Sequence, residues 1–264
     1  MKKTIRKFAP AVLVLVALAT LSFMAKDGVT LRLRPQQGKT QTIITKANMM
    51  TMMEVQGQTM NMSQNMETKQ TYTPKEVTDA KSVIETQIEA IKMTISQMGM
   101  KLEYDSEHPE KTSPMLAGQT KEIEAKLHKP TSIAYDALGK LTDDSEDQSM
   151  NQLGVVIELP EKEISVGSTW TNTTVQENNG IEFEAEITYT VTAISKKSVD
   201  VNVSGIVKGQ TEDVSGTYTG TASLNPQTGL LINSSIKQNL SMTISEQGMS
   251  IPITVVGTTT VEVK

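Results

Sequence analysis

Alternation of apolar and polar residues constrains this chain more than any other feature of its sequence. The clearest stretch is 181–191, with apolar residues at odd positions and Glu or Thr at even positions. The same period of two recurs over 199–224 and 230–263. Successive side chains of a strand point to opposite faces, so this pattern predicts strands with one apolar and one solvated face. The second half of the chain is therefore predicted to be an antiparallel meander.

The first half shows the same period less regularly. Leu31 and Leu33 begin it, and short helices or loops are expected at 113–120 and 146–153. We predict strands over 41–55, 59–72, 82–90, 91–104, 123–127 and 133–141. The predicted fold is all-β: a strongly curved antiparallel sheet of two related halves, forming a half-barrel or partly closed barrel, with one or two short helices.

The expected organisation is a leader, two β halves and a joint. Residues 26–144 form the first half with a methionine-rich hairpin, 145–160 the joint and 161–264 the second half. A faint internal repeat supports the division, for example Gly38-Lys-Thr with Gly167-Ser-Thr.

Residues 1–25 are typical of a secretory signal peptide. Lys2, Lys3, Arg6 and Lys7 precede the uncharged stretch 8–25. An uncleaved N-terminal anchor is the alternative, since this stretch is close to the roughly 18 residues needed for a membrane span. We expect export to the periplasm, cell envelope or extracellular space.

Charge and cysteine content exclude several function classes. Without its four leader cations the chain has 21 of its 25 basic residues against 30 acidic ones, a net charge of about −9. An acidic surface disfavours nucleic acid as a partner. The chain has no cysteine, which excludes disulfides, thiolate zinc sites and cysteine nucleophiles.

Seven of the sixteen methionines lie within 49–66. A hairpin that turns at Gln56-Gly57 pairs Met53 with Met60 and Thr51 with Met62. The apolar face then carries the candidate binding residues Met49, Met53, Met60, Met62 and Met66. Met50 and Met52 fall on the polar face, where nothing in the sequence explains them.

Three interpretations of this methionine face stay open. Methionine fills irregular gaps in cores, and it also forms adaptable surfaces that accept many apolar partners. Its thioether is a soft ligand suited to Cu(I) or Ag(I), for which Met53, Met60 and Met62 are the candidate residues. The face is thus core filler, the wall of an apolar pocket, or a metal site.

Catalytic motifs are absent from the sequence. Its two histidines, His108 and His128, fall in polar or proline-flanked stretches typical of loops. No nucleophile elbow, zinc-binding helix motif or phosphate-binding glycine loop occurs. We therefore expect a protein that is not an enzyme and needs no cofactor.

The segment 159–170, LPEKEISVGSTW, resembles a recurrent segment of uncharacterised exported bacterial β-proteins, a domain-of-unknown-function family. Tyr104-Asp105-Ser106 and the methionine-rich early strands are similar to the same family. The long-stranded meander is more remotely similar to half-barrels of lipid and lipoprotein carriers in the envelope. This resemblance implies no catalytic residues, and Trp170 is expected to plug one end of the barrel.

The leading functional hypothesis is an exported binding module that holds an apolar or lipid-like partner on a concave face. A structural or assembly protein of the envelope, with a protein partner and no small ligand, is the first alternative. Methionine-based Cu(I) or Ag(I) binding is the second.

Overall fold

The computed structural model describes residues 28–55, 57–116, 118, 120–142, 156–178, 181–209, 214–246 and 249–264. The predicted leader and residues 145–155 of the predicted joint lie outside these ranges. Within them, no helix combines the length and hydropathy of a membrane span.

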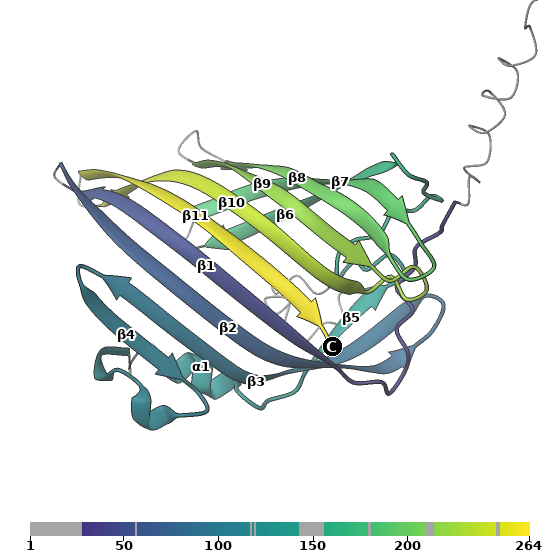
Figure 1. Ribbon diagram of the computed structural model, residues 1–264, viewed down its shortest axis with the longest axis horizontal. Helices are drawn as coiled ribbons and strands as arrows, with labels where there is room; N and C mark the ends of the chain where they lie inside the picture. Colours follow the sequence, from purple (N-terminus) through teal and green to yellow (C-terminus); the bar gives the residue numbers. More distant parts are fainter. Residues whose placement is uncertain are drawn as a thin grey trace, which may run out of the picture.

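One curved antiparallel sheet makes up most of the fold (Figure 1). The strands of its first part are β1 (Gln41–Val55), β2 (Gln58–Val77), β3 (Lys81–Gln97), β4 (Met100–Asp105) and β5 (Thr131–Asp136). Those of its second part are β6 (Thr169–Asn178), β7 (Ile181–Ile194), β8 (Val199–Gly209), β9 (Val214–Leu224), β10 (Leu231–Glu246) and β11 (Met249–Val263). One helix, α1 (Thr120–Lys126), and two 3-10 turns, η1 (Pro109–Lys111) and η2 (Pro114–Leu116), complete the described elements.

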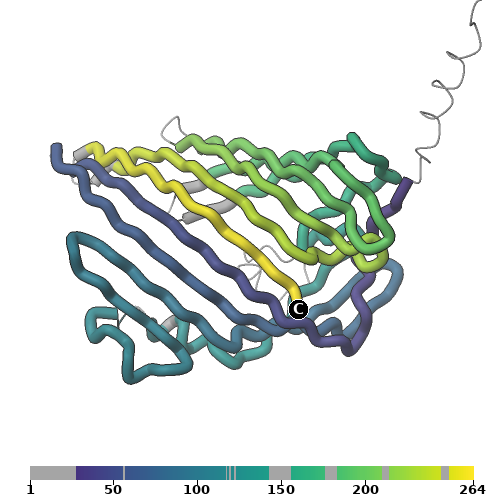
Figure 2. Tube along the Cα trace, in the orientation of Figure 1, coloured from purple at the N-terminus to yellow at the C-terminus, as the bar shows by residue number. Residues whose placement is uncertain are grey.

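The strand order is β4-β3-β2-β1-β11-β10-β9-β8-β7-β6, with β5 paired to β3 off this path. The sheet curls strongly but does not close, which confirms the predicted all-β fold of a half-barrel with a short helix. The first and last long strands lie side by side, since β1 pairs with β11 from Ile43–Val263 to Met53–Ile253 (Figure 2). Strands from both predicted halves therefore share one continuous sheet.

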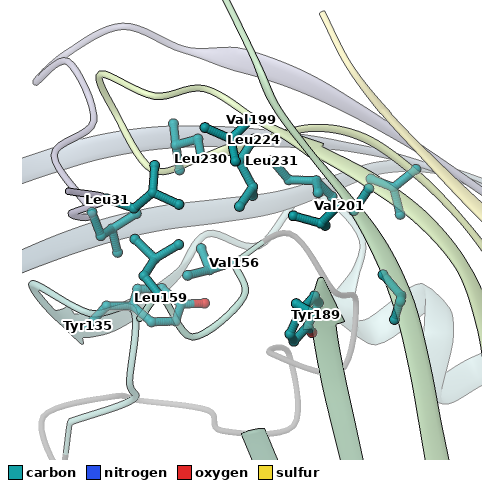
Figure 3. Close-up of a cluster of buried hydrophobic side chains, with 14 of the residues drawn as sticks. Leu31, Tyr135, Val156, Leu159, Tyr189, Val199, Val201, Leu224, Leu230 and Leu231 are labelled. Atoms are coloured by element: carbon teal, nitrogen blue, oxygen red, sulfur yellow. The ribbon is translucent and has the colours of Figure 1, made fainter. Parts of the chain in front are cut away.

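The largest hydrophobic cluster lies at the end of the sheet that carries the turns β2–β3, β7–β8 and β9–β10. We call this end the base. The opposite end, which carries the turns β1–β2 and β10–β11, is called the rim. Strand ends at the base contribute Val199, Leu224 and Leu231 to this cluster (Figure 3). The N-terminal segment adds Leu31 and Leu33, and the segment before β6 adds Leu159.

Trp170 lies in this base, in agreement with the expected plug. Its ring stacks on Tyr189 with centroids 5.0 Å apart. Its indole Nε1–H donates to the carbonyl oxygen of Glu158 at 2.9 Å. The hydrogen bond joins the start of β6 to the segment before it, and the stack joins β6 to its neighbour β7.

A second cluster covers the inner face of β3 and β4. Ile88, Ile91, Met93, Tyr104 and Leu116 are buried in it, and Ile123 and Leu127 pack against them. The sequence prediction of a strand at 123–127 is wrong, because these residues lie in or next to α1. Ile123 and Leu127 are four residues apart, which places them on one face of a helix, and Lys, Glu and Ala are good helix formers.

The predicted boundary between a strand at 82–90 and a strand at 91–104 is also wrong. These two strands are β3, which runs unbroken through Ala90 and Ile91, and the short β4. The register of β2 and β3 shifts between Lys69 and Gln70, opposite this point. A bulge changes the phase of alternation without ending the strand. The true turn is at Met98 and Gly99, both with positive φ.

Candidate functional site

Charged side chains gather on the outer face of the long strands. In β1, β2, β7, β8, β9 and β11 the register places every described Asp, Glu, Lys and Arg among the outward-facing residues, and Lys237 of β10 is outward as well. Lys46 and Glu67, for example, are direct cross-strand partners and form an outer ion pair with Nζ and Oε2 3.2 Å apart. Away from the rim, the inner face of these strands is apolar or uncharged.

A cavity of about 370 Å³ lies against this inner face, near the base. Its wall comes from β1 and β7 to β11, and Ile157 of the segment before β6 borders it as well. The lining residues are Met49, Ile157, Ile187, Tyr189, Val203, Tyr218, Ala222, Leu231, Ser234, Ile236, Gln238, Thr259 and Val261. The volume falls in the range of about 300–1,000 Å³ typical of small-molecule sites, and none of these residues is charged.

The most polar lining groups are Gln238 and Tyr218, which are direct cross-strand partners on β10 and β9. The amide Nε2 of Gln238 donates to the Sδ of Met49 at 3.9 Å. On the other side of Met49, its cross-strand partner Gln64 donates to the Sδ of Met93 at 3.5 Å. A thioether is a weak acceptor, so both amides keep most of their hydrogen-bonding capacity.

Burial moves the pKa of two tyrosines of this wall further above the physiological range. It raises the pKa of Tyr189 to about 12, with a smaller contribution from Glu158. It also raises the pKa of Tyr218. Both hydroxyls are therefore uncharged donors and acceptors throughout the physiological pH range.

Four inward-facing glycines, Gly205, Gly216, Gly220 and Gly257, lie in the strands that form the wall. A Cβ on Gly220 would stand 2.1 Å from the carbonyl oxygen of Ser235. A Cβ on Gly216 would stand 2.6 Å from that of Asn239. Glycine in a strand marks tight bends and close backbone approach, so these residues permit the curvature that shapes the cavity.

The methionine hairpin has the predicted register. Met53 lies opposite Met60, and Thr51 opposite Met62. Among the candidate residues, Met49 lines the cavity and Met66 packs against the second cluster. Met53, Met60 and Met62 share this face but lie nearer the rim, outside the cavity lining.

Met50 and Met52 lie on the outer face. Met50 is 50% exposed opposite Val256, which is 43% exposed. Met50 and Val256 line a hollow of about 510 Å³, together with the polar residues Asn48, Asn65 and Lys237. Nothing in the structure explains these two methionines.

The candidate metal ligands are the thioethers of Met53, Met60 and Met62. Met53 and Met60 are adjacent across the strands, and Met62 is the next inward residue of β2. The described residues contain no group of three His, Cys, Asp or Glu placed to hold a metal. His108 and His128 have side chains 51% and 65% exposed.

The sequence did not single out Gln238, Tyr218 or Tyr189. Gln238 had a local signal, because it is the polar exception between Ile236 and Leu240 on the apolar side of β10. The tyrosines had none, since tyrosine fits the apolar face of any strand.

Residues 140–231 match the model of a family of unknown function, DUF6263. This confirms the predicted resemblance over that range, which contains the 159–170 segment. No curated protein matches the chain.

Three solved structures are similar to this chain at low identity. The first, titled as lipid–protein interactions in lipovitellin, has 11% identity and a TM-score of 0.44, over 87% of this chain and 25% of that one. The translocator domain of the autotransporter NalP from Neisseria meningitidis has 7% identity and a TM-score of 0.36, over 85% and 88%. An outer membrane channel from Pseudomonas putida F1 has 8% identity and a TM-score of 0.33, over 90% and 98%.

This chain spans a quarter of the lipovitellin chain. All three TM-scores lie below 0.5, and none of these likenesses bears on the function.

Proposed function

We propose that this protein is an exported binding module of the cell envelope or its surroundings that holds an apolar, lipid-like ligand against the inner face of its sheet. The observation that carries the proposal is the uncharged cavity of about 370 Å³ walled by six strands and Ile157. A pocket with mostly apolar lining and a few convergent polar groups is the usual form of a small-molecule site. The leader-like residues 1–25 support export.

Binding without catalysis is the role we infer. The lining provides no charged group to act as an acid or base, and burial raises the pKa of Tyr189 and Tyr218 above the ordinary value of tyrosine, which makes their hydroxyls weaker acids. A structural protein without a small ligand is less favoured, since close-packed interiors leave few voids larger than a water molecule.

Two neighbouring methionines offer a matched test. Met49 lines the cavity, and Met50 points to the outer face. We expect the uncharged probe N-phenyl-1-naphthylamine to bind saturably to the wild-type protein and equally to Met50→Lys. Met49→Lys should bind it at least tenfold more weakly, because an unpaired ammonium in the cavity stays hydrated and excludes apolar groups.

Fluorescence titration measures these affinities, and urea unfolding checks that both variants are folded. Ser234→Phe, which adds bulk to the same wall without charge, is a second obstruction if Met49→Lys does not fold. Absence of saturable wild-type binding, or equal binding to Met50→Lys and the obstructed variant, would contradict the proposal.

A further inference from the structure

The cavity restricts the charge of its ligand as well as its polarity. An ionised group taken out of water costs several kcal/mol unless a counter-charge and hydrogen bonds replace its hydration. Carboxylates and phosphates are usually met by Arg or Lys. No lining residue is charged, and the described cations of the surrounding strands are on the outer face. A ligand with an ionised head inside the cavity would therefore be unpaired.

Two polar groups of the wall are direct neighbours. Gln238 and Tyr218 face each other across β10 and β9, and the next inward residues of β10 are Ile236 and Leu240. On the β1 side Met49 shares the cavity with them. The wall is thus mostly apolar, with Gln238 and Tyr218 as an adjacent hydrogen-bonding pair; Ser234, Thr259 and Tyr189 add further uncharged hydroxyls.

This pair has free capacity. The one hydrogen bond found for Gln238 among the described residues goes to the Met49 sulfur at 3.9 Å. Its Oε1 and second N–H, and the Tyr218 hydroxyl, are available to a ligand. Buried polar groups in proteins are nearly always hydrogen-bonded, so a ligand that covers the pair must offer both a donor and an acceptor.

Building on the proposed function, we propose that the ligand is an uncharged amphiphile, with an apolar chain along the wall and a hydroxyl, ester or amide group bound between Gln238 and Tyr218. Acylglycerols belong to this chemical class, whereas ionised fatty acids and phospholipid head groups do not.

Two probes with the same chain test the charge preference: 1-monolauroylglycerol and laurate, both below their aggregation concentrations at pH 8. Calorimetry measures their affinities, and the single Trp170, stacked on the lining residue Tyr189, gives an independent fluorescence signal. We expect monolauroylglycerol to bind at least tenfold more tightly than laurate.

Neighbouring residues of β10 provide the variant and its control. Gln238→Leu removes the amide from the cavity and should weaken monolauroylglycerol binding by about five- to tenfold, the value of a net hydrogen bond. Asn239→Leu alters the outer face and should leave the affinity unchanged. Gln238→Lys places a cation in the wall and should shift the preference toward laurate; it also keeps the test decisive if Gln238→Leu fails to fold.

The outcomes separate this inference from the proposed function. Equal or tighter binding of laurate to the wild-type protein overturns the inference but leaves apolar binding standing. Unchanged monolauroylglycerol affinity in folded Gln238→Leu also overturns it. Binding of neither lipid overturns the proposed function and this inference together.

Discussion

At the residue scale, the shape of the inner face depends on its glycines as much as on its large side chains. Gly220 faces inward between Ile236 of β10 and Val203 of β8. Its missing side chain lets the backbone of β10 approach at a distance that no Cβ could tolerate. Tyr189 does the opposite: it fills the base with a large ring whose hydroxyl stays neutral.

Gly220→Ala tests the close approach. Its Cβ would overlap the carbonyl oxygen of Ser235, a backbone atom that can yield only by flattening the sheet. We expect a loss of about 2 kcal/mol or more in the free energy of unfolding, within or above the usual cost of overpacking. Urea unfolding measures it.

Gly118→Ala is the control, since Gly118 has open space around its Cα and no positive φ. It should change the free energy of unfolding by no more than about 0.5 kcal/mol. An equal effect of the two substitutions would contradict the role given to Gly220.

Tyr189 makes a second residue-scale prediction, on alkaline stability. Its pKa is about 12 in the folded protein and 10.0 for the free side chain. Between these values the unfolded chain loses the phenolic proton and the folded one keeps it, so stability falls as pH rises from about 10 to 12. The full loss from this group is on the order of 2–3 kcal/mol.

Chemical unfolding at pH 8 to 12 measures this loss. Tyr189→Phe removes the titrating group, so its stability should fall less steeply over this range than that of the wild type. The buried Tyr72 and Tyr135, whose pKa values are also raised, should account for the remaining slope. Identical slopes for the two proteins would rule out the assignment to Tyr189.

At the element scale, the sequence predicted what depends on local alternation. The bounds of β1 and the register of the methionine hairpin were correct, because a slip of one residue would bury Asn48 and Asn61. The helix α1 was missed because the short stretch Ile-Glu-Ala-Lys-Leu fits both a period of two and a spacing of four. The bulge in β3 was missed because it changes the phase of alternation in the way that the start of a new strand would. The cavity could not be predicted from local sequence patterns, because its wall combines residues of β1 with residues of β7 to β11.

The helix α1 offers an element-scale prediction. Ile123→Ser removes an apolar contact with the second cluster, and Lys121→Ser changes an exposed position of the same helix. The helix propensity cost of serine applies to both. We expect Ile123→Ser to cost about 1–2 kcal/mol more, roughly the value of a partly buried isoleucine. Urea unfolding followed by circular dichroism measures the difference, and no difference would mean that α1 does not stabilise the sheet.

At the scale of the whole molecule, the sheet is firmly packed at the base and less so towards the rim. Val199, Val201 and Leu224 are almost fully buried, whereas Met53 and Met60 are only partly covered. Amide exchange depends on local opening. We expect backbone amides of β8 and β9 near the base to exchange at least a hundredfold more slowly than those around Met53 and Met60, as measured by hydrogen–deuterium exchange. Uniform protection along β1 and β2 would contradict this gradient.

The continuous strand order makes the cavity a property of the whole chain. The pairing of β1 with β11 brings Met49 to the same space as Gln238 and Tyr218. An uncharged wall on the inner face and charges on the outer face are consistent with the proposed binding of an apolar molecule.

Native mass spectrometry of the protein purified from its own cells tests this most directly. We predict one apolar, uncharged molecule bound per chain, retained in Met50→Lys and lost in folded Met49→Lys. A wild-type protein that carries no such molecule, even after incubation with total lipid extract from those cells, would contradict it.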